Sequence, residues 1–199
     1  MTPYRQVRAL YDADGVRVYQ AYSNEIADAA LEHGRFVSPP FSLTRMTWIK
    51  PSFLWMMYRS GWAKKDPGQA RILAIDLHRS AFEEVLACGH LTHYDPVLPW
   101  AHEEWKQLAV RSPVLVQWDP ERTLRHHPLD YRTIQIGLKS EAVRSYVAEW
   151  IATITDITPT VDQIRELVEA RKDQEAMALL PEERPYPVDD AVRQRLAMT

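Results

Sequence analysis

Strand-type and helix-type segments alternate along the first two thirds of the chain, and this order limits the folds that the chain can adopt. Residues 16–22 alternate between two faces and are rich in β-branched and aromatic side chains, which is typical of a strand. Ser23 or Asn24 can then cap a short helix, which Gly34 would end. Further strands are expected at residues 71–77, 114–118 and 132–138. Strands interleaved with helices predict an α+β protein.

An apolar block in the first third predicts a second helix. We expect this helix to begin at Pro51, because a proline at the first helical position leaves no N–H group unpaired. It would run to Ser60 and end at Gly61. Its side chains are apolar nearly all round, so we expect it to be buried or to face a pocket.

The last third of the chain carries helix-type patterns. Apolar side chains in residues 143–154 recur at i, i+3, i+4 and i+7, which predicts an amphipathic helix. Residues 160–163 match a capping box for the next helix, and a last short helix is expected at residues 188–198. The C-terminal third is therefore expected to be helical. We divide the chain into a core domain at residues 1–158 and a helical extension at residues 159–199 that packs on the core.

Composition excludes several classes of protein. Lys and Arg number 24 and Asp and Glu number 27, so the net charge of −3 provides no overall basic field for nucleic acid. The single cysteine, Cys88, cannot form an internal disulfide or a Cys-rich zinc site, and we expect it to be a small buried thiol. His90 and His93 are spaced i, i+3 and His126 and His127 are adjacent, but no Cys or HExxH-type helix accompanies them, so we expect no metal. No apolar run approaches the roughly 20 residues that cross a bilayer, so we expect a cytoplasmic protein with no membrane partner.

The block at residues 48–62 concentrates tryptophan, methionine and cationic side chains. One interpretation is a buried core helix with a cation at its C-terminal end. The other is an aromatic and cationic wall that stacks a base and holds phosphate. In the second interpretation the candidate nucleotide-binding residues are Lys50, Ser52, Trp55, Tyr58 and Arg59.

Four arginines lie at or near the ends of expected elements. They are Arg59, Arg79, Arg122 and Arg132. Guanidinium groups that converge on a cleft suit a pyrophosphate, whereas separate surface ion pairs suit an ordinary protein surface. The sequence leaves both alternatives open.

Four segments in a fixed order resemble one known family. They are residues 48–62, 74–76, 117–122 and 132–137. Together they extend over nearly the whole chain and look like the family named domain of unknown function 4291. The name of this family implies no activity.

A second resemblance concerns residues 18–34. A strand, a short helix and a glycine in this order are similar to the opening of the ADP-ribosyltransferase superfamily. This resemblance implies a split β-sheet around a nicotinamide cleft. Gln20 occupies the position where the superfamily often has His or Arg. Gln135 is the candidate for the residue that orients the ribose, and Asp119 is a second candidate for contact with the ribose hydroxyls.

The same resemblance implies a function. The chain would take NAD as substrate and transfer ADP-ribose to a protein, a nucleic acid or a small molecule. Tyr22 or Trp55 would stack on the nicotinamide, and Lys50 or Arg59 would hold the phosphates.

Two other functions stay open from the sequence. A non-catalytic module could bind nucleotide or RNA through a cleft of Trp, Lys and Arg side chains. Alternatively, an exposed apolar stripe at residues 143–154 could hold a partner or form a dimer. A split sheet with Gln20 and Gln135 on one cleft favours the transferase, whereas an unbroken flat sheet with exposed aromatic side chains favours the binding module.

Overall fold

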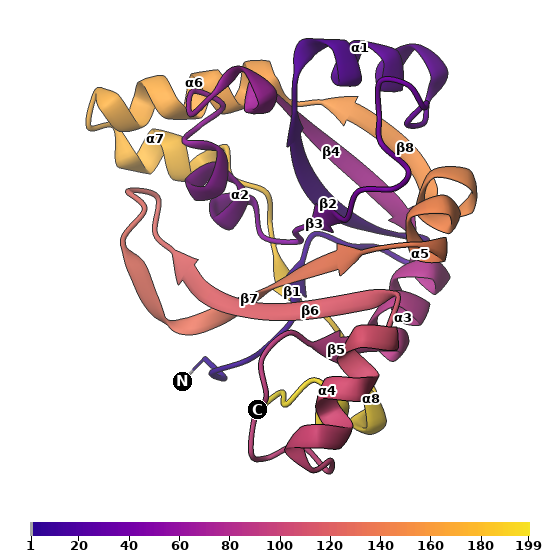
Figure 1. Ribbon diagram of the computed structural model, residues 1–199. Helices are drawn as coiled ribbons and strands as arrows, with labels where there is room; N and C mark the ends of the chain where they lie inside the picture. Colours follow the sequence, from indigo (N-terminus) through magenta and orange to yellow (C-terminus); the bar gives the residue numbers. More distant parts are fainter. Residues whose placement is uncertain (1) are drawn as a thin grey trace.

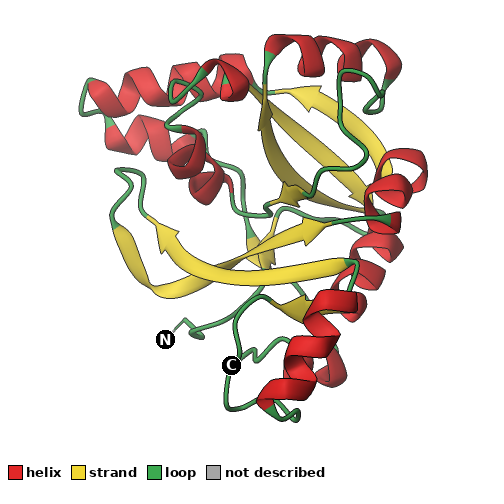
Figure 2. Cartoon of the chain, viewed as in Figure 1, coloured by secondary structure: helices red, strands yellow, loops and turns green. Residues whose placement is uncertain are grey.

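Two β-sheets with helices on their outer sides form the body of the protein (Figures 1 and 2). A computed structural model describes residues 2–199. Within these residues, three strands form one sheet, four strands form a second, and two short strands pair near the ends of the chain. The α+β class expected from the sequence is confirmed.

The first sheet has the order β2-β4-β8 and is antiparallel throughout. Its strands are β2 (Gly15–Tyr22), β4 (Arg71–His78) and β8 (Ile151–Asp156). On β2, Val16 and Val18 point into the core between the sheets, whereas Tyr19 packs on the opposite face. The strand expected at residues 16–22 is therefore confirmed, with the alternation of faces that its sequence pattern indicates.

The second sheet has the order β3-β7-β6-β5. Its strands are β3 (Thr47–Ile49), β7 (Pro128–Leu138), β6 (Val114–Arg122) and β5 (Gly89–Leu91). Gln117 of β6 lies directly opposite Gln135 of β7, so the two side chains project from the same face. The two sheets meet where the Tyr19 N–H donates to the Lys50 carbonyl at 2.7 Å.

Helices cover both sheets and build two cores. They are α1 (Asn24–His33), α2 (Phe53–Ser60), α3 (Arg79–Cys88), α4 (His102–Arg111), α5 (Glu141–Ser145), α6 (Thr158–Glu169), α7 (Asp173–Ala178) and α8 (Asp190–Arg195), with a 3-10 turn η1 (Pro67–Gln69) and a π-helical turn η2 (Tyr146–Trp150). The main core lies between the sheets, and side chains of α3 and α8 contribute to it. A smaller core joins α2, α6 and α7 to the other face of β2 and β4.

Helix α2 begins later than the sequence analysis predicted. Ser52 is its N-cap, and the Ser52 hydroxyl oxygen accepts from the Trp55 N–H at 3.1 Å. Pro51 therefore precedes the cap, and the prediction that it is the first helical residue is wrong, because the serine satisfies a free N–H that a proline start cannot. The predicted end is confirmed, since Gly61 has a φ of 57°, in the left-handed region where a Cβ would be strained.

The predicted amphipathic helix at residues 143–154 is wrong in its second half. The helical conformation ends with the turn η2 at Trp150, and Ile151 begins strand β8. Ile154 pairs with Ile75 of β4 across the first sheet. The C-terminal third is therefore only partly helical, because its β-branched residues complete the sheet instead.

Three smaller expectations also differ from the structure. Strand β6 continues through residues 119–122, beyond its expected end at residue 118, because an irregularity near Pro120 accommodates the proline. Helix α6 already begins at Thr158, so residues 160–163 lie inside it and do not form a capping box. Cys88 is exposed rather than buried, because it lies off the apolar face of α3.

The two ends of the chain lie together (Figure 1). Strand β1 (Arg8–Ala9) pairs with β9 (Arg184–Pro185), and the Arg5 N–H donates to the Thr199 hydroxyl at 3.0 Å. Leu196 is fully buried in the main core. Residues near the C-terminus thus pack on the core, while the boundary at residue 158 stays a prediction.

Candidate functional site

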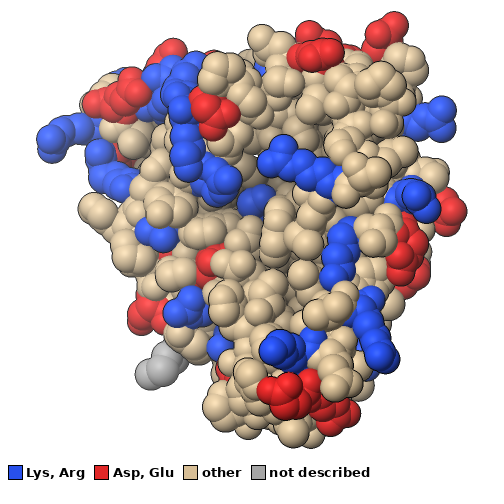
Figure 3. Space-filling view, in the orientation of Figure 1, with Lys and Arg blue, Asp and Glu red and all other residues tan. Residues whose placement is uncertain are grey.

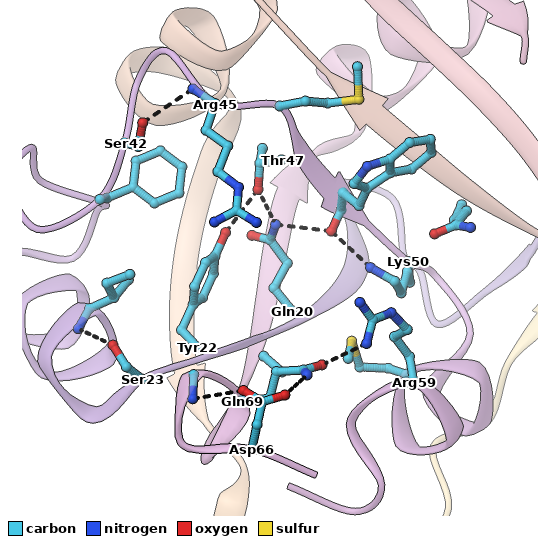
Figure 4. Close-up of a pocket in the computed structure, with 18 of the residues that line it drawn as sticks. Gln20, Tyr22, Ser23, Ser42, Arg45, Thr47, Lys50, Arg59, Asp66 and Gln69 are labelled. Carbon is cyan, nitrogen blue, oxygen red and sulfur yellow. Dashed lines mark hydrogen bonds between the residues drawn. The ribbon is translucent and has the colours of Figure 1, made fainter.

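A cavity of about 800 Å³ opens between the two sheets (Figure 4). Its walls come from the end of β2, from residues 40–50 around β3, from α2 and the turn η1, and from β6 and β7. The polar and charged side chains among its lining residues are Gln20, Tyr22, Ser23, Ser42, Arg45, Thr47, Lys50, Arg59, Asp66, Gln69, Gln117 and Gln135. A cavity of this size can hold a nucleotide or a dinucleotide.

Cations dominate the charge of this cavity. Arg45, Lys50 and Arg59 line it, and among residues 2–199 none of them forms an ion pair with a carboxylate. The Arg59 guanidinium donates to the Gln69 side-chain oxygen at 3.2 Å. Figure 3 shows Lys and Arg side chains around a central hollow of the surface. Unpaired cations in a hollow create a positive potential that attracts anions.

Lys50 is the most deeply placed of the three cations. Only 6% of it is exposed, and its ammonium group donates to the Trp48 carbonyl at 3.2 Å. The pKa of Lys50 is lowered to about 7: burial is the largest cause, repulsion by Arg59 acts in the same direction, and Asp119 opposes the shift. An anion that enters the cavity would favour the protonated form of this side chain.

Two glutamine side chains form an amide pair on the wall from the second sheet. Gln117 donates its side-chain N–H to one oxygen of Asp119 at 2.9 Å, and Gln135 donates to the other oxygen at 2.6 Å. Because a carboxylate can only accept, these bonds fix the orientation of both amides. Each carbonyl oxygen remains free of hydrogen bonds to residues 2–199 and can accept from a ligand hydroxyl.

Gln20 organises the inner end of the cavity. Its side-chain N–H group donates to the Thr47 hydroxyl at 2.7 Å and to the Trp48 carbonyl at 3.1 Å, while its oxygen accepts from Tyr146 at 2.7 Å. The Tyr22 and Thr47 hydroxyls are also within 2.9 Å of each other (Figure 4). Burial raises the pKa of both tyrosines, so this network stays uncharged and holds β2 against β3.

Five of the residues predicted for the site line the cavity. They are Gln20, Tyr22, Lys50, Arg59 and Gln135. Asp119 lies directly behind the amide pair. Residues that are distant in the sequence thus meet at one place.

Four other predicted residues do not line this cavity. Ser52 is fully buried as the N-cap and donates to Glu121 at 2.9 Å, so it has a structural role. The Arg122 guanidinium lies 3.7 Å from the centre of the Tyr58 ring and 5.4 Å from that of Trp55. This arrangement is a cation–π cluster outside the cavity.

The remaining arginines lie elsewhere. Arg79 donates to Glu83 at 3.1 Å and lies over the rings of Tyr11 and Tyr186. Arg132 lines a second, smaller cavity. The structure therefore does not bring the four predicted arginines together, because the ends of their elements point to different sides of the molecule.

Several residues of the cavity were absent from the predicted site. Arg45, Gln69 and Gln117 belong to this group. Arg45 lies in a loop without a periodic pattern, so the sequence offered no signal for it. Gln117 becomes a candidate only once residues 114–118 are known to pair with residues 132–138, a pairing that was not predicted from the sequence.

Residues 2–199 hold no group of three or more His, Cys, Asp or Glu side chains arranged to hold a metal ion. Within the same residues, every helix is too short or too polar to cross a bilayer.

The fold and the cavity define an α+β protein with a cationic, nucleotide-sized cavity between two sheets. The chain belongs to the family described as domain of unknown function (DUF4291), whose model matches residues 6–186. This confirms the first of the two resemblances seen in the sequence. No curated protein matches the chain.

Proposed function

We propose that this protein is an ADP-ribosyltransferase-like enzyme that binds NAD in the cavity between its sheets and transfers ADP-ribose to an acceptor. One observation carries the proposal: Gln20 and Gln135, from different sheets, line a single cavity that also holds three cations without acidic partners. Two sheets that meet at the contact between Tyr19 and Lys50 support a split-sheet fold of the transferase type.

The cations suit the pyrophosphate of NAD. Arg45 and Arg59 offer planar, forked donors that match phosphate oxygens, and Lys50 adds a compact charge. Because these groups have no carboxylate partner among residues 2–199, a phosphate does not have to displace one before it binds.

The amide pair suits the ribose next to the nicotinamide. Departure of nicotinamide develops positive charge on the ribose, as in glycoside cleavage. The free carbonyl oxygens of Gln117 and Gln135 can accept from ribose hydroxyls, and the Asp119 carboxylate behind them stabilises the developing charge. Tyr22 and Trp48 supply aromatic surface for the nicotinamide ring. Trp55 lies outside the cavity lining and is not part of this role.

Titration of the protein with NAD, with a parallel assay of nicotinamide release, tests the proposal. We expect binding together with release. Arg45→Ala should weaken NAD binding by about tenfold through loss of charge-assisted hydrogen bonds. It should leave the melting temperature unchanged, since the Arg45 side chain is exposed. Arg111→Ala on α4, an exposed arginine outside the cavity, serves as the control.

The absence of binding at millimolar NAD would overturn the proposal. Equal NAD affinities for Arg45→Ala, Arg111→Ala and the unaltered protein would show that NAD does not bind in this cavity.

A non-catalytic nucleotide-binding module is the second candidate. The two carboxylates near the cavity favour this function, because both already accept hydrogen bonds from the protein. Asp66 accepts from Gly68 and Gln69, and Asp119 accepts from the amide pair. Binding of NAD or ADP without nicotinamide release, in the presence of candidate acceptors, would identify this function.

A further inference from the structure

A second cavity of about 350 Å³ lies beside the first. Gln117 lines both cavities. Asp119 lines the second cavity and accepts from Gln135, which lines the first. The hydrogen-bonded chain of Gln135, Asp119 and Gln117 therefore forms the partition between them. A ligand in the second cavity would lie close to the groups that we propose to contact the ribose.

A cation and an aromatic ring characterise the second cavity. Arg132 donates to the Tyr4 hydroxyl at 2.6 Å and to the Trp118 carbonyl at 3.1 Å. Among the described residues it forms no ion pair with a carboxylate, whereas its neighbour Arg5 pairs with Asp95 at 2.5 Å. Tyr4 is 46% exposed, and the guanidinium carbons of Arg132 and Arg5 lie 5.4 and 5.9 Å from the centre of its ring. A guanidinium without a carboxylate partner next to an exposed ring suits a nucleotide, because the guanidinium can bind the phosphate and the ring can stack on the base.

Asp119 gives this cavity the opposite chemistry at the partition. Each of its oxygens accepts one amide hydrogen bond, and each retains a second lone pair. A hydroxyl group can donate to such an oxygen. The cavity thus offers a site for an anion at Arg132 and a site for a hydroxyl at Asp119, and a ribonucleotide carries both groups.

We propose that the second cavity binds the acceptor, a 5′-phosphorylated ribonucleotide whose phosphate lies on Arg132, whose base stacks on Tyr4 and whose ribose hydroxyl donates to Asp119. This assignment rests on the proposed function. The shared chemistry can come from a free mononucleotide or from the end of an RNA strand.

The transfer step balances without a further reactant. The bond between the ribose carbon and the nicotinamide nitrogen breaks, and nicotinamide leaves as a neutral molecule with the electron pair. The acceptor hydroxyl oxygen forms the new bond to that carbon, and its proton passes to Asp119 and then to water. The partition places Asp119 between donor and acceptor, which is the position that this proton transfer requires.

Binding of 5′-AMP, measured without NAD, tests the acceptor cavity separately. Because 5′-AMP can also enter the first cavity, the variants decide the site. Arg132→Ala and Tyr4→Ala should each weaken the binding of 5′-AMP in the second cavity by about tenfold, and both should leave the affinity for NAD unchanged. Arg45→Ala should weaken the binding of NAD and leave unchanged the 5′-AMP binding that depends on Arg132. Tyr4 is exposed, so its variant keeps the test valid if Arg132→Ala folds poorly.

The ligand series tests the two chemical requirements. Adenosine, without phosphate, and 2′,3′-dideoxy-AMP, without ribose hydroxyls, should both lose the binding that depends on Arg132. With NAD present, mass spectrometry should find ADP-ribose added to 5′-AMP or to a 5′-phosphorylated tetraribonucleotide, and the better acceptor identifies the source.

Two results would overturn the inference while leaving the proposed function intact. One is NAD cleavage with 5′-AMP binding that responds only to Arg45→Ala. The other is transfer to a phosphoserine peptide and not to either ribonucleotide. The absence of NAD binding, with 5′-AMP binding that still depends on Arg132, would instead overturn the proposed function and keep the second site as a nucleotide site.

Discussion

At the scale of single residues, Lys50 has the most unusual environment in the cavity. It is buried beside Arg59 without a carboxylate contact, and its pKa of about 7 lies far below the ordinary 10.5 of a lysine. A bound anion favours the charged form of the amine, so anion binding and proton uptake are linked. We therefore expect the protonation state of Lys50 to affect the affinity of the cavity for anions near neutral pH.

We expect the affinity for ADP to fall by about tenfold between pH 6 and pH 8, because the unliganded Lys50 loses its proton over this range. Lys50→Met should bind ADP weakly at both pH values and show no fall in affinity between them, because the terminal phosphate of ADP gains charge over this range and the titrating amine is gone. Isothermal titration calorimetry at several pH values, in buffers of different ionisation enthalpy, measures both the affinity and the proton uptake. A flat profile for the unaltered protein would contradict this role of Lys50.

At the scale of secondary-structure elements, the N-terminus of α2 is held by a carboxyl group from the far end of the chain. Glu183, just before β9, accepts from the Phe53 N–H at 2.6 Å. Burial raises the pKa of Glu183 to about 8, and the nearby Glu121 contributes in the same direction. In the folded protein this carboxyl is therefore protonated at pH values where it is ionised in the unfolded chain.

The sign of the resulting pH dependence follows from this shift. A folded pKa above the unfolded value of 4.5 stabilises the protein fully below about pH 4.5, and the contribution is lost as the pH rises through about 8. Glu183→Gln keeps the acceptor oxygen and removes the titration, so at pH 8.5 it should be more stable than the unaltered protein by about 1–2 kcal/mol. Urea denaturation at pH 5, 7 and 8.5 measures this difference. The exposed Glu182→Gln is the matched control, and equal pH slopes for both variants would refute the prediction.

The pairing of β3 with β7 depends on the absence of a side chain at Gly137. A Cβ there would lie 3.0 Å from the Met46 sulfur and 3.1 Å from the Trp48 ring, and both of these residues line the cavity. Gly137→Ala should destabilise the protein by about 1–2 kcal/mol through overpacking and should also weaken ligand binding. Gly15→Ala, whose Cβ would meet its nearest atom at 3.4 Å, should have a smaller effect in the same denaturation assay. Equal stabilities for the two variants would show that the wall can adjust freely.

Local sequence patterns predicted correctly those elements whose conformation depends on nearby residues alone. The strand at residues 16–22 and the helix that follows it are examples, because caps and alternation are encoded within a few residues. Strand β8 was missed because its isoleucines continue the helical spacing of the preceding residues, and only its pairing with β4 decides between the two states. Only some of the residues that line the cavity were predicted, for the same reason. Arg45 and Gln117 reach the cavity only because segments that are distant in the sequence meet there.

At the scale of the whole molecule, the C-terminal segment closes the main core. Leu196 is fully buried, and its carbonyl accepts from the indole N–H of Trp118 on β6 at 2.8 Å. Gly89 at the start of β5 lies against the same leucine, since a Cβ there would be 3.2 Å from a Leu196 methyl group. The second sheet is thus held from its edge by the last residues of the chain.

Leu196→Ala should lower the free energy of unfolding by about 2–4 kcal/mol, because it leaves a cavity in a closely packed core. Val110→Ala, at a position that is 73% exposed, should change it by less than about 0.5 kcal/mol. Thermal and urea denaturation measure both variants. A Leu196→Ala protein as stable as the control would mean that the C-terminal segment is not part of the cooperative fold.

The bonds from Gln117 and Gln135 to Asp119 also determine the direction in which a ligand can enter. A freely rotating amide can present its nitrogen or its oxygen in either direction, but here both nitrogens are held at Asp119, so each oxygen is free to accept a hydrogen bond. A phosphate turned toward this wall would be repelled by the Asp119 carboxylate behind the amides, whereas the same phosphate is attracted to the cations. An elongated molecule with hydroxyls at one end and phosphates at the other therefore fits in one orientation and is disfavoured in the reverse. The distribution of charge on the walls therefore selects the orientation of the ligand before any covalent bond is made or broken.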